Sequence, residues 1–207
     1  MIADEDAARR FCAERCGPEG MQKLDRLAAS LAEENARQNL ASGGSLASVW
    51  QRHFADSLQL LDHAADAEGL WLDLGSGAGF PGLPLAIARP NARLTLVESR
   101  RRRIEWLERC ISDLNLSNCS VIGARVENAA GMDARVITAR AFAPFAKLLR
   151  LSARFSTPAT VWLLPKGRSA AQELAAQPAR VAAMFHVEQS VTDPGGGILI
   201  GRGVPLT

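Results

Sequence analysis

The sequence contains few of the side chains that bind zinc. It has four cysteines and three histidines, and only Cys12 and Cys16 lie close together, with no pair of histidines near them. A structural zinc site requires about four such ligands at short, regular spacing. We therefore expect no metal in this protein.

Long apolar runs and a one-sided charge are also absent. No run approaches the roughly 20 apolar residues that span a bilayer, and the start, MIADEDAARR, is acidic where a signal peptide is basic and then apolar. The formal net charge is only +2, so the composition indicates neither a nucleic-acid partner nor its absence. We expect a reduced, cytoplasmic protein in which local clusters of basic residues matter more than their total.

The apolar residues follow two different patterns along the chain. Up to about residue 66 they recur at helical spacing, first at Met21, Leu24, Leu27 and Leu31, and then, after a predicted loop at 41–45, from Trp50 onward. From about residue 70, short apolar runs alternate with helical segments. The predicted strands are 70–74, 93–98, 119–122, 135–139, 159–164, 185–191 and 198–201. The predicted helices between them are 81–89, 100–115, 144–155 and 168–177.

This alternation predicts an α/β fold with a doubly wound, mostly parallel, seven-stranded sheet. The last two strands flank the turn TDPGGG and predict an antiparallel hairpin, which is typical of class I methyltransferases that use S-adenosylmethionine (SAM). We expect an N-terminal helical extension over 1–66. A Rossmann-like SAM-binding domain then covers 67–207 as one compact unit.

A glycine-rich loop follows the first predicted strand. Its glycines are Gly75, Gly77, Gly79 and Gly82. The loop leads into a helix at Pro81 and lies where doubly wound sheets bind ligands, beyond the carboxyl ends of the strands. The last three glycines match the dinucleotide fingerprint G-x-G-x-x-G, whereas Asp73 and the first three form the D-x-G-x-G-x-G loop of SAM enzymes. Asp73 favours SAM, because an acid at this point suits the ammonium of SAM and repels a pyrophosphate.

An acid also ends the second predicted strand. Glu98 stands nineteen residues after Gly79, close to the spacing of about 20 expected for a carboxylate that accepts hydrogen bonds from ribose hydroxyls. Such an acid occurs in both dinucleotide and SAM enzymes. Glu98 therefore supports an adenosine-containing cofactor without deciding which one.

Five segments resemble a known family. They are RHFADSL (Arg52–Leu58), WLDLGSGAGFPGLPLAI (Trp71–Ile87), ARVE (Ala124–Glu127), ARAFA (Ala139–Ala143) and PKG (Pro165–Gly167). Together they look like the bacterial 16S rRNA guanine-N7 methyltransferase family, also called glucose-inhibited division protein B. The resemblance runs from about residue 35 to the C-terminus. Before RHFADSL only Asn39-Leu40 clearly matches, so no role is carried over to the first forty residues.

The resemblance implies methyl transfer from SAM to guanine N7 of 16S rRNA, at position 527 in the 530 loop, with S-adenosylhomocysteine as the product. It implies 16S rRNA within a small-subunit particle as the partner, and neither DNA nor a membrane. From the loop and the resemblance together, the expected cofactor contacts are Asp73, Gly75, Gly77, Gly79, Phe80, Glu98, Val126, Glu127 and Arg140.

The residues after the fourth and fifth predicted strands suit attack by guanine N7. N7 carries a free lone pair and has no proton to lose, so the transfer requires alignment rather than a general base. The segment ARAFAP lacks the Asp/Asn-Pro-Pro-aromatic motif of adenine-amine methylation, and no cysteine follows a proline, as it does in pyrimidine-C5 methylation. We expect Arg140 and Lys166 to be the catalytic residues. Each would hold a phosphate or guanine O6. Arg140 would contact O6, a phosphate or the SAM carboxylate and leave N7 free; the alternative for Arg140 is a structural ion pair.

Two polar clusters remain. The run Arg100, Arg101, Arg102 and Arg103 opens a helix, where cations are disfavoured by the helix dipole. RNA phosphate would explain the run, and a solvated face paired with Glu105 and Glu108 is the alternative. His53, with Asp56 and Ser57 one turn on, is expected to pack the N-terminal helices against the cofactor-binding domain rather than to act as an acid or base.

Three other functions stay open on the sequence alone. An NAD-dependent oxidoreductase would need a substrate domain, but only about 40 residues follow the fifth predicted strand. A binding module without turnover, and a SAM-dependent methyltransferase that acts on a small molecule or a protein, are the other two.

Overall fold

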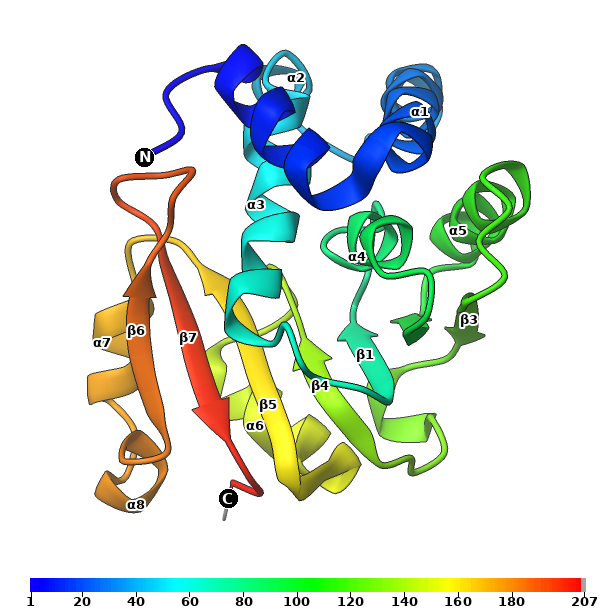
Figure 1. Ribbon diagram of the computed structural model, residues 1–207. Coiled ribbons are helices and arrows are strands. Elements are labelled where there is room, and N and C mark those ends of the chain that lie inside the picture. Colours follow the sequence, from blue (N-terminus) through cyan, green and yellow to red (C-terminus); the bar gives the residue numbers. More distant parts are fainter. Residues whose placement is uncertain (206–207) are drawn as a thin grey trace.

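A seven-stranded sheet forms the centre of the protein (Figure 1). The computed structural model describes residues 1–205. The strands are β1 (Leu70–Leu74), β2 (Arg93–Glu98), β3 (Cys119–Gly123), β4 (Ala134–Thr138), β5 (Ser156–Lys166), β6 (Phe185–Gln189) and β7 (Gly197–Arg202). Their order across the sheet is β3-β2-β1-β4-β5-β7-β6. Strand β7 is antiparallel to both neighbours, and the other pairs are parallel, which confirms the predicted fold class and the closing hairpin.

Helices cover both faces of this sheet. They are α1 (Glu5–Gln38), α2 (Gly43–Leu46), η1 (Trp50–Ala55), α3 (Asp56–Leu58), η2 (Gln59–His63), α4 (Gly82–Ala88), α5 (Arg101–Asp113), η3 (Val126–Asn128), α6 (Phe145–Ser152), η4 (Ala153–Phe155), α7 (Ala170–Ala175) and α8 (Ala179–Ala182). Alternate residues of a strand point to opposite faces, so Trp71 packs with α1, η1, α4 and α5 while Leu72 packs with α6, η4 and α8. Burial on both faces explains why the strands read as continuous apolar runs.

In Figure 1, α1 lies beyond the carboxyl ends of the parallel strands, whereas the helical run that includes α3 passes in front of the sheet. Leu24, Leu27 and Leu31 of α1 are fully buried, as the helical spacing predicts, and α1 kinks at Gly17, whose φ is 62°. The Glu5 carboxylate accepts hydrogen bonds from the backbone N–H groups of Trp50 and Gln51, at 3.0 and 2.8 Å, and so joins α1 to η1. One hydrophobic cluster includes residues of α1, η1 and the sheet, so the N-terminal helices share a core with the rest of the chain. The predicted division of the chain at residue 66 stays a prediction.

The predicted loop at 41–45 is partly wrong. The structure places the short helix α2 at Gly43–Leu46, because the Ser42 hydroxyl accepts a hydrogen bond from the Ser45 N–H at 3.2 Å and caps the turn. A single capped turn has no apolar periodicity, so its sequence resembles that of a loop.

The β6–β7 turn is tied to the N-terminal helices by hydrogen bonds. The Ile2 N–H donates to the Val191 carbonyl at 2.7 Å, and the Val191 N–H donates to Gln59 Oε1 at 2.9 Å. The Gln51 side chain donates to the Thr192 carbonyl at 3.2 Å. The edge hairpin and the helices therefore enclose one region above the carboxyl ends of β4 and β5.

The cysteines lie inside the structure as free thiols. Burial raises the pKa of Cys12, Cys110 and Cys119 to about 12, so all three stay protonated at neutral pH. Within residues 1–205, no cluster of three or more His, Cys, Asp or Glu side chains could hold a metal ion. In the same part of the chain, none of the helices is both long and apolar enough to cross a bilayer.

Candidate functional site

Two cavities adjoin at the carboxyl ends of the parallel strands. The first, which we term the glycine-loop cavity, has a volume of about 350 Å³ and is bordered by Gly75, Glu98 and the residues after β3. The second, the Arg140 cavity, has a volume of about 730 Å³ and lies between η1, the ends of β4 and β5, and the β6–β7 turn. The two share the segment Ala141–Ala143, which borders both.

The glycine loop is shaped by backbone angles that other residues rarely adopt. The φ angles of Gly75, Gly77 and Gly79 are 68°, 58° and 101°. A Cβ atom at Gly75 would lie 2.4 Å from the ring of Phe142, and one at Gly79 would lie 2.3 Å from Leu83. The loop therefore requires glycine both for its conformation and for close packing.

Glu98 joins this loop to the start of α5. Its Oε2 accepts a hydrogen bond from the Gly77 N–H at 2.9 Å, and its Oε1 accepts from the N–H groups of Ser99 and Arg100 at 2.7 and 2.8 Å. The side chain is 5% exposed and borders the glycine-loop cavity together with Val126 and Glu127. Of the predicted cofactor contacts, Gly75, Glu98, Val126 and Glu127 are thus brought together.

Asp73 lies beneath the loop and does not border either cavity. It is 2% exposed, and its Oδ1 accepts a hydrogen bond from the Thr138 hydroxyl at 3.0 Å. Its Oδ2 is buried and has no partner among the described residues. Burial raises the pKa of this carboxyl to about 6, although hydrogen bonds from Ser76 and Thr138 oppose the shift. A role for Asp73 in cofactor binding stays a prediction.

The arginine run divides into two pairs. Arg100 and Arg103 border the glycine-loop cavity, together with Arg125 and Lys147. Arg101 instead points outward, with 92% of its side chain exposed and an ion pair to Glu105 at 2.8 Å, and Arg102 is exposed. RNA binding by these four arginines stays a prediction, but they do not form one surface.

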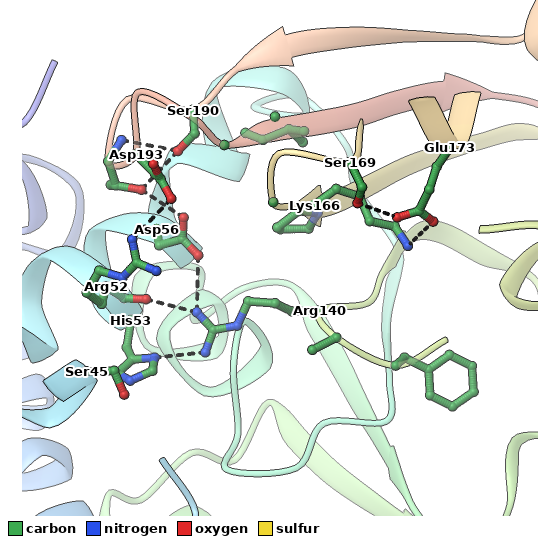
Figure 2. Close-up of a pocket in the computed structure, with 18 of the residues that line it drawn as sticks. Ser45, Arg52, His53, Asp56, Arg140, Lys166, Ser169, Glu173, Ser190 and Asp193 are labelled. Atoms are coloured by element: carbon green, nitrogen blue, oxygen red, sulfur yellow. Dashed lines mark hydrogen bonds and ion pairs between the residues drawn. The ribbon is translucent and has the colours of Figure 1, made fainter. Parts of the chain in front are cut away.

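Arg140 connects the end of β4 to the helix that carries RHFADSL (Figure 2). Its Nη1 donates to Asp56 Oδ2 at 3.1 Å and to the Arg52 carbonyl at 3.0 Å, and its Nη2 donates to His53 Nδ1 at 2.9 Å. Residues 50–55 form a π-helix, a wide turn that often occurs at functional sites. Arg52, His53 and Asp56 all border the Arg140 cavity.

His53 is a neutral acceptor in this network. Burial first, and then the charges of Arg140 and Arg52, lower its pKa to about 3. Its ring stacks on Phe80, with centroids 4.6 Å apart, and its Nε2 is buried with no partner among the described residues. Phe80 is 3% exposed and also lies 5.1 Å from the Arg140 guanidinium. The structure therefore places Phe80 beneath Arg140. Neither Phe80 nor the predicted contacts Gly77 and Gly79 borders a cavity, and their roles stay predictions.

Lys166 lies on the opposite side of the Arg140 cavity and holds the loop after β4 (Figure 2). Its Nζ donates to Glu173 Oε2 at 2.9 Å and to the Ala143 carbonyl at 3.2 Å. Glu173 also accepts hydrogen bonds from the Phe145 N–H and the Ser169 hydroxyl, both at 2.8 Å. These bonds outweigh burial and keep the pKa of Glu173 below its usual range. Arg140 and Lys166 thus border one cavity, and both of their charged ends are already engaged.

Three residues of this site were not predicted from the sequence. Glu173 pairs with Lys166, Asp193 pairs with Arg52 at 3.2 Å, and Phe142 borders both cavities. The only local signals were a glutamate four residues after Ser169 and an aspartate in the turn TDPGGG. Neither signal names its partner, because the partners come together only in the fold.

Comparisons with known proteins give a consistent result. A family model described as rRNA small subunit methyltransferase G matches residues 20–197. The chain is 59% identical over 203 residues to the ribosomal RNA small subunit methyltransferase G of Erythrobacter litoralis, covering 98% of each chain. It is 53% identical over 184 residues to that of Novosphingobium aromaticivorans, covering 88% of this chain and 80% of the other.

Solved structures share the fold at low sequence identity. A methyltransferase from Geobacter sulfurreducens matches with a TM-score of 0.60 and 15% identity, covering 86% of this chain and 90% of the other. An RNA methyltransferase from Salinibacter ruber, in complex with S-adenosylhomocysteine, matches with a TM-score of 0.51 and 17% identity, covering 73% and 91%. These matches confirm the class I methyltransferase fold.

Proposed function

The chain belongs to the rRNA small subunit methyltransferase G family, and on this premise we propose that it methylates N7 of a guanine in 16S rRNA, the guanine at position 527 in the 530 loop, with SAM as the donor. The main support for N7 as the methylated atom comes from the titratable side chains around the Arg140 cavity. Each of these side chains already forms a hydrogen bond or an ion pair within the protein.

No group in the described part of this cavity is free to act as a general base. His53 is neutral and uses Nδ1 as the acceptor for Arg140, so its remaining nitrogen carries the proton. Asp56, Glu173 and Asp193 are paired with Arg140, Lys166 and Arg52. Guanine N7 attacks with a free lone pair and has no proton to lose, so it suits a cavity of this kind. An exocyclic amine, which must lose a proton, would suit it less well.

The residues around the glycine-loop cavity fit a SAM donor. Gly75, which borders this cavity, leaves no room for a side chain, and the Glu98 carboxylate keeps one lone pair, on Oε2, for a ribose hydroxyl after accepting three backbone hydrogen bonds. Arg103 borders the same cavity, and Val126 offers an apolar contact to a purine. When bound, SAM supplies a methyl group on a positively charged sulfur.

The chain's own residues orient the two reactants rather than exchange protons with them. The ion pairs of Arg140 and Lys166 hold the loop after β4 in place, and the N–H groups that these pairs leave unused can donate to guanine O6. The rate then depends on the alignment of N7 with the methyl group and on exclusion of water.

Methyl transfer from labelled SAM tests this function directly. Purified small-subunit particles that lack the modification, naked 16S rRNA, bulk protein and an adenine-rich RNA are offered as acceptors. We expect label in 16S rRNA alone, at one guanine, in a base that cleaves on reduction and aniline treatment as N7-methylguanine does. Label in protein, or at an exocyclic amine, would contradict the proposal.

A thermal-shift experiment tests the donor separately. We expect SAM and S-adenosylhomocysteine to raise the melting temperature, and NAD to leave it unchanged, since a ligand that binds only the folded state stabilises it. Stabilisation by NAD alone would instead favour the oxidoreductase.

A further inference from the structure

The loop between β4 and α6 is held firmly at both ends and carries an exposed turn in the middle. At one end Arg140 is bound to Asp56 and His53, and at the other the Ala143 carbonyl and the Phe145 N–H are bound by Lys166 and Glu173. Between these ends Ala141 has a φ of 53°, a left-handed conformation that costs an alanine about 1 kcal/mol or more. Such strain persists where the surroundings impose it.

Phe142 occupies the middle of this loop and borders both cavities. Its ring contacts the backbone of Gly75 so closely that a Cβ there would lie 2.4 Å from Cδ2 and 3.1 Å from Cγ. The side chain is half-buried, so part of the ring packs against its neighbours and part is open. The ring thus lies at the boundary that a group passing from one cavity to the other must cross.

The other apolar residues that line the Arg140 cavity, among them Pro144, Pro165 and Ile198, carry no aromatic ring. Arg52, Asp56, Arg140 and Lys166 are charged. Among the residues that line either cavity, His53 is the one other aromatic side chain, and one face of its ring is covered by Phe80. An unpaired base needs a flat partner on which to stack, and in single-stranded recognition aromatic rings serve this purpose.

We propose that Phe142 is the platform on which the target guanine stacks, and that it sets the plane in which N7 faces the glycine-loop cavity. This inference rests on the proposed function, because it assumes that a nucleobase enters the Arg140 cavity. The fixed ends of the loop make the platform rigid. The ring of Phe142 contacts Gly75 and therefore lies against the glycine-loop cavity, where the donor is proposed to bind. A base stacked on this ring would lie next to the methyl group that is transferred.

Three substitutions of one residue separate stacking from packing. Phe142→Tyr keeps the aromatic ring, Phe142→Leu keeps apolar volume without a ring, and Phe142→Ala removes both. Melting temperature and circular dichroism are recorded for each variant. If Phe142→Ala folds poorly, the comparison of Phe142→Tyr with Phe142→Leu still distinguishes stacking from packing. The kcat/KM for small-subunit particles and the Kd of S-adenosylhomocysteine by calorimetry are then measured.

Loss of base stacking should lower kcat/KM for RNA by about 5- to 150-fold in Phe142→Leu and Phe142→Ala, the range expected for one base–aromatic contact. Phe142→Tyr should stay within about threefold of wild type, and the Kd of S-adenosylhomocysteine in Phe142→Leu within about threefold. Equal kcat/KM values for the Leu and Tyr variants would overturn the platform. A Kd that weakens by the same factor as kcat/KM would also overturn it, because the ring would then serve the donor.

The wild-type protein distinguishes a failure of this inference from a failure of the proposed function. If the wild type does not methylate small-subunit rRNA, the proposed function falls and the platform falls with it. If the wild type methylates one guanine and the Leu and Tyr variants match it, only the platform is wrong.

Discussion

The glycine-loop cavity and the Arg140 cavity meet at Ala141–Ala143 but are built in different ways. The first is formed by three successive turns of the doubly wound sheet, after β1, β2 and β3, and its central acid, Glu98, is bound by backbone N–H groups. The second combines η1, the ends of β4 and β5, and the β6–β7 turn, which ion pairs between side chains hold together.

The charges of the two cavities differ in the same way. Arg100, Arg103, Arg125 and Lys147 border the glycine-loop cavity, and none of them has an ion-pair partner among residues 1–205. In the Arg140 cavity, Arg52, Arg140 and Lys166 each pair with an acid. Cations without an ion-pair partner are available to bind an anion. Paired cations instead fix the positions of the helices, strands and loops that their ion pairs connect.

The largest effect should come from Arg140→Ala. The substitution leaves Asp56 and the buried His53 without their partner and removes a charge from the wall that faces the acceptor. We expect single-turnover methyl transfer to fall about 10²–10³-fold, as when one preorganised donor is removed from an active site. The Kd of S-adenosylhomocysteine should change by less than about threefold.

Arg140→Lys serves as the matched variant for this test. It keeps the charge but has one donor nitrogen where arginine uses Nη1 for Asp56 and Nη2 for His53, so it should recover only part of the rate. Near-wild-type transfer by Arg140→Ala would rule out its role in the reaction. A parallel loss of donor affinity would show that the two cavities are not separable.

A smaller effect is expected from Lys166→Met. The substitution frees the Ala143 carbonyl and removes the ion-pair partner of Glu173, which still accepts the Phe145 N–H, so one of the two anchors of the loop that carries Phe142 is weakened. We expect a loss of about 1–3 kcal/mol in unfolding free energy. Methyl transfer should be about tenfold slower, which corresponds to about 1.4 kcal/mol in the barrier.

A double-mutant cycle with Glu173→Gln identifies the source of this effect. If the ion pair acts through the loop, the double variant should lose little more than Lys166→Met alone, in both unfolding by urea and transfer rate. Additive losses in rate would instead indicate that Lys166 contacts the acceptor itself, as the sequence analysis expected.

The same contrast explains what the sequence could predict. The strands were predicted closely because burial on both faces leaves continuous apolar runs, and the glycine loop because one local pattern, from Asp73 to Gly79, carries it. The Arg140 cavity was predicted only in part. Arg140 and Asp56 lie 84 residues apart, and the apolar spacing from Trp50 onward predicts a helix there but not the π-helical turn that brings His53 toward Arg140.

The pH dependence of donor binding tests whether the Asp73 carboxylate, which lies beneath the glycine loop, contributes to the cofactor site. Its pKa is about 6 in the folded chain against an ordinary value of 3.8, so the folded state binds more protons between these values. Without donor, this group's contribution to stability is therefore lost as pH rises from about 4 to about 6. If Asp73 serves the ammonium of SAM, the donor binds the ionised form.

Donor affinity should then rise with pH and level off above about 6. Calorimetry should show that S-adenosylhomocysteine binds about tenfold more tightly at pH 7 than at pH 5, with about fivefold of this change between pH 5 and 6, because a group of pKa about 6 must lose one proton on binding. Asp73→Asn should bind more weakly at pH 7 and lose this dependence. A Kd for the wild type that stays constant from pH 5 to 7 would remove Asp73 from the cofactor site.

The smallest effect, and the sharpest test of the free cations, concerns the salt dependence of RNA binding. Replacing Arg100 and Arg103 by Ala should lower the slope of log K against log salt by about 1.4–1.8, or about 0.7–0.9 for each phosphate that is no longer neutralised. Affinity at a single moderate salt concentration should change only a few-fold. Arg101→Ala is the matched control, because Arg101 comes from the same run but pairs with Glu105 away from the cavity.

These slopes distinguish three interpretations of the run Arg100–Arg103. A lower slope in the double variant, with an unchanged slope in Arg101→Ala, means that RNA phosphate crosses the mouth of the glycine-loop cavity, where the unpaired cations lie. A lower slope in Arg101→Ala as well would extend the RNA-binding surface to the outer face of α5, as the sequence analysis expected. An unchanged slope in the double variant would mean that Arg100 and Arg103 serve the donor alone, and the two cavities would then differ in charge for a reason other than RNA.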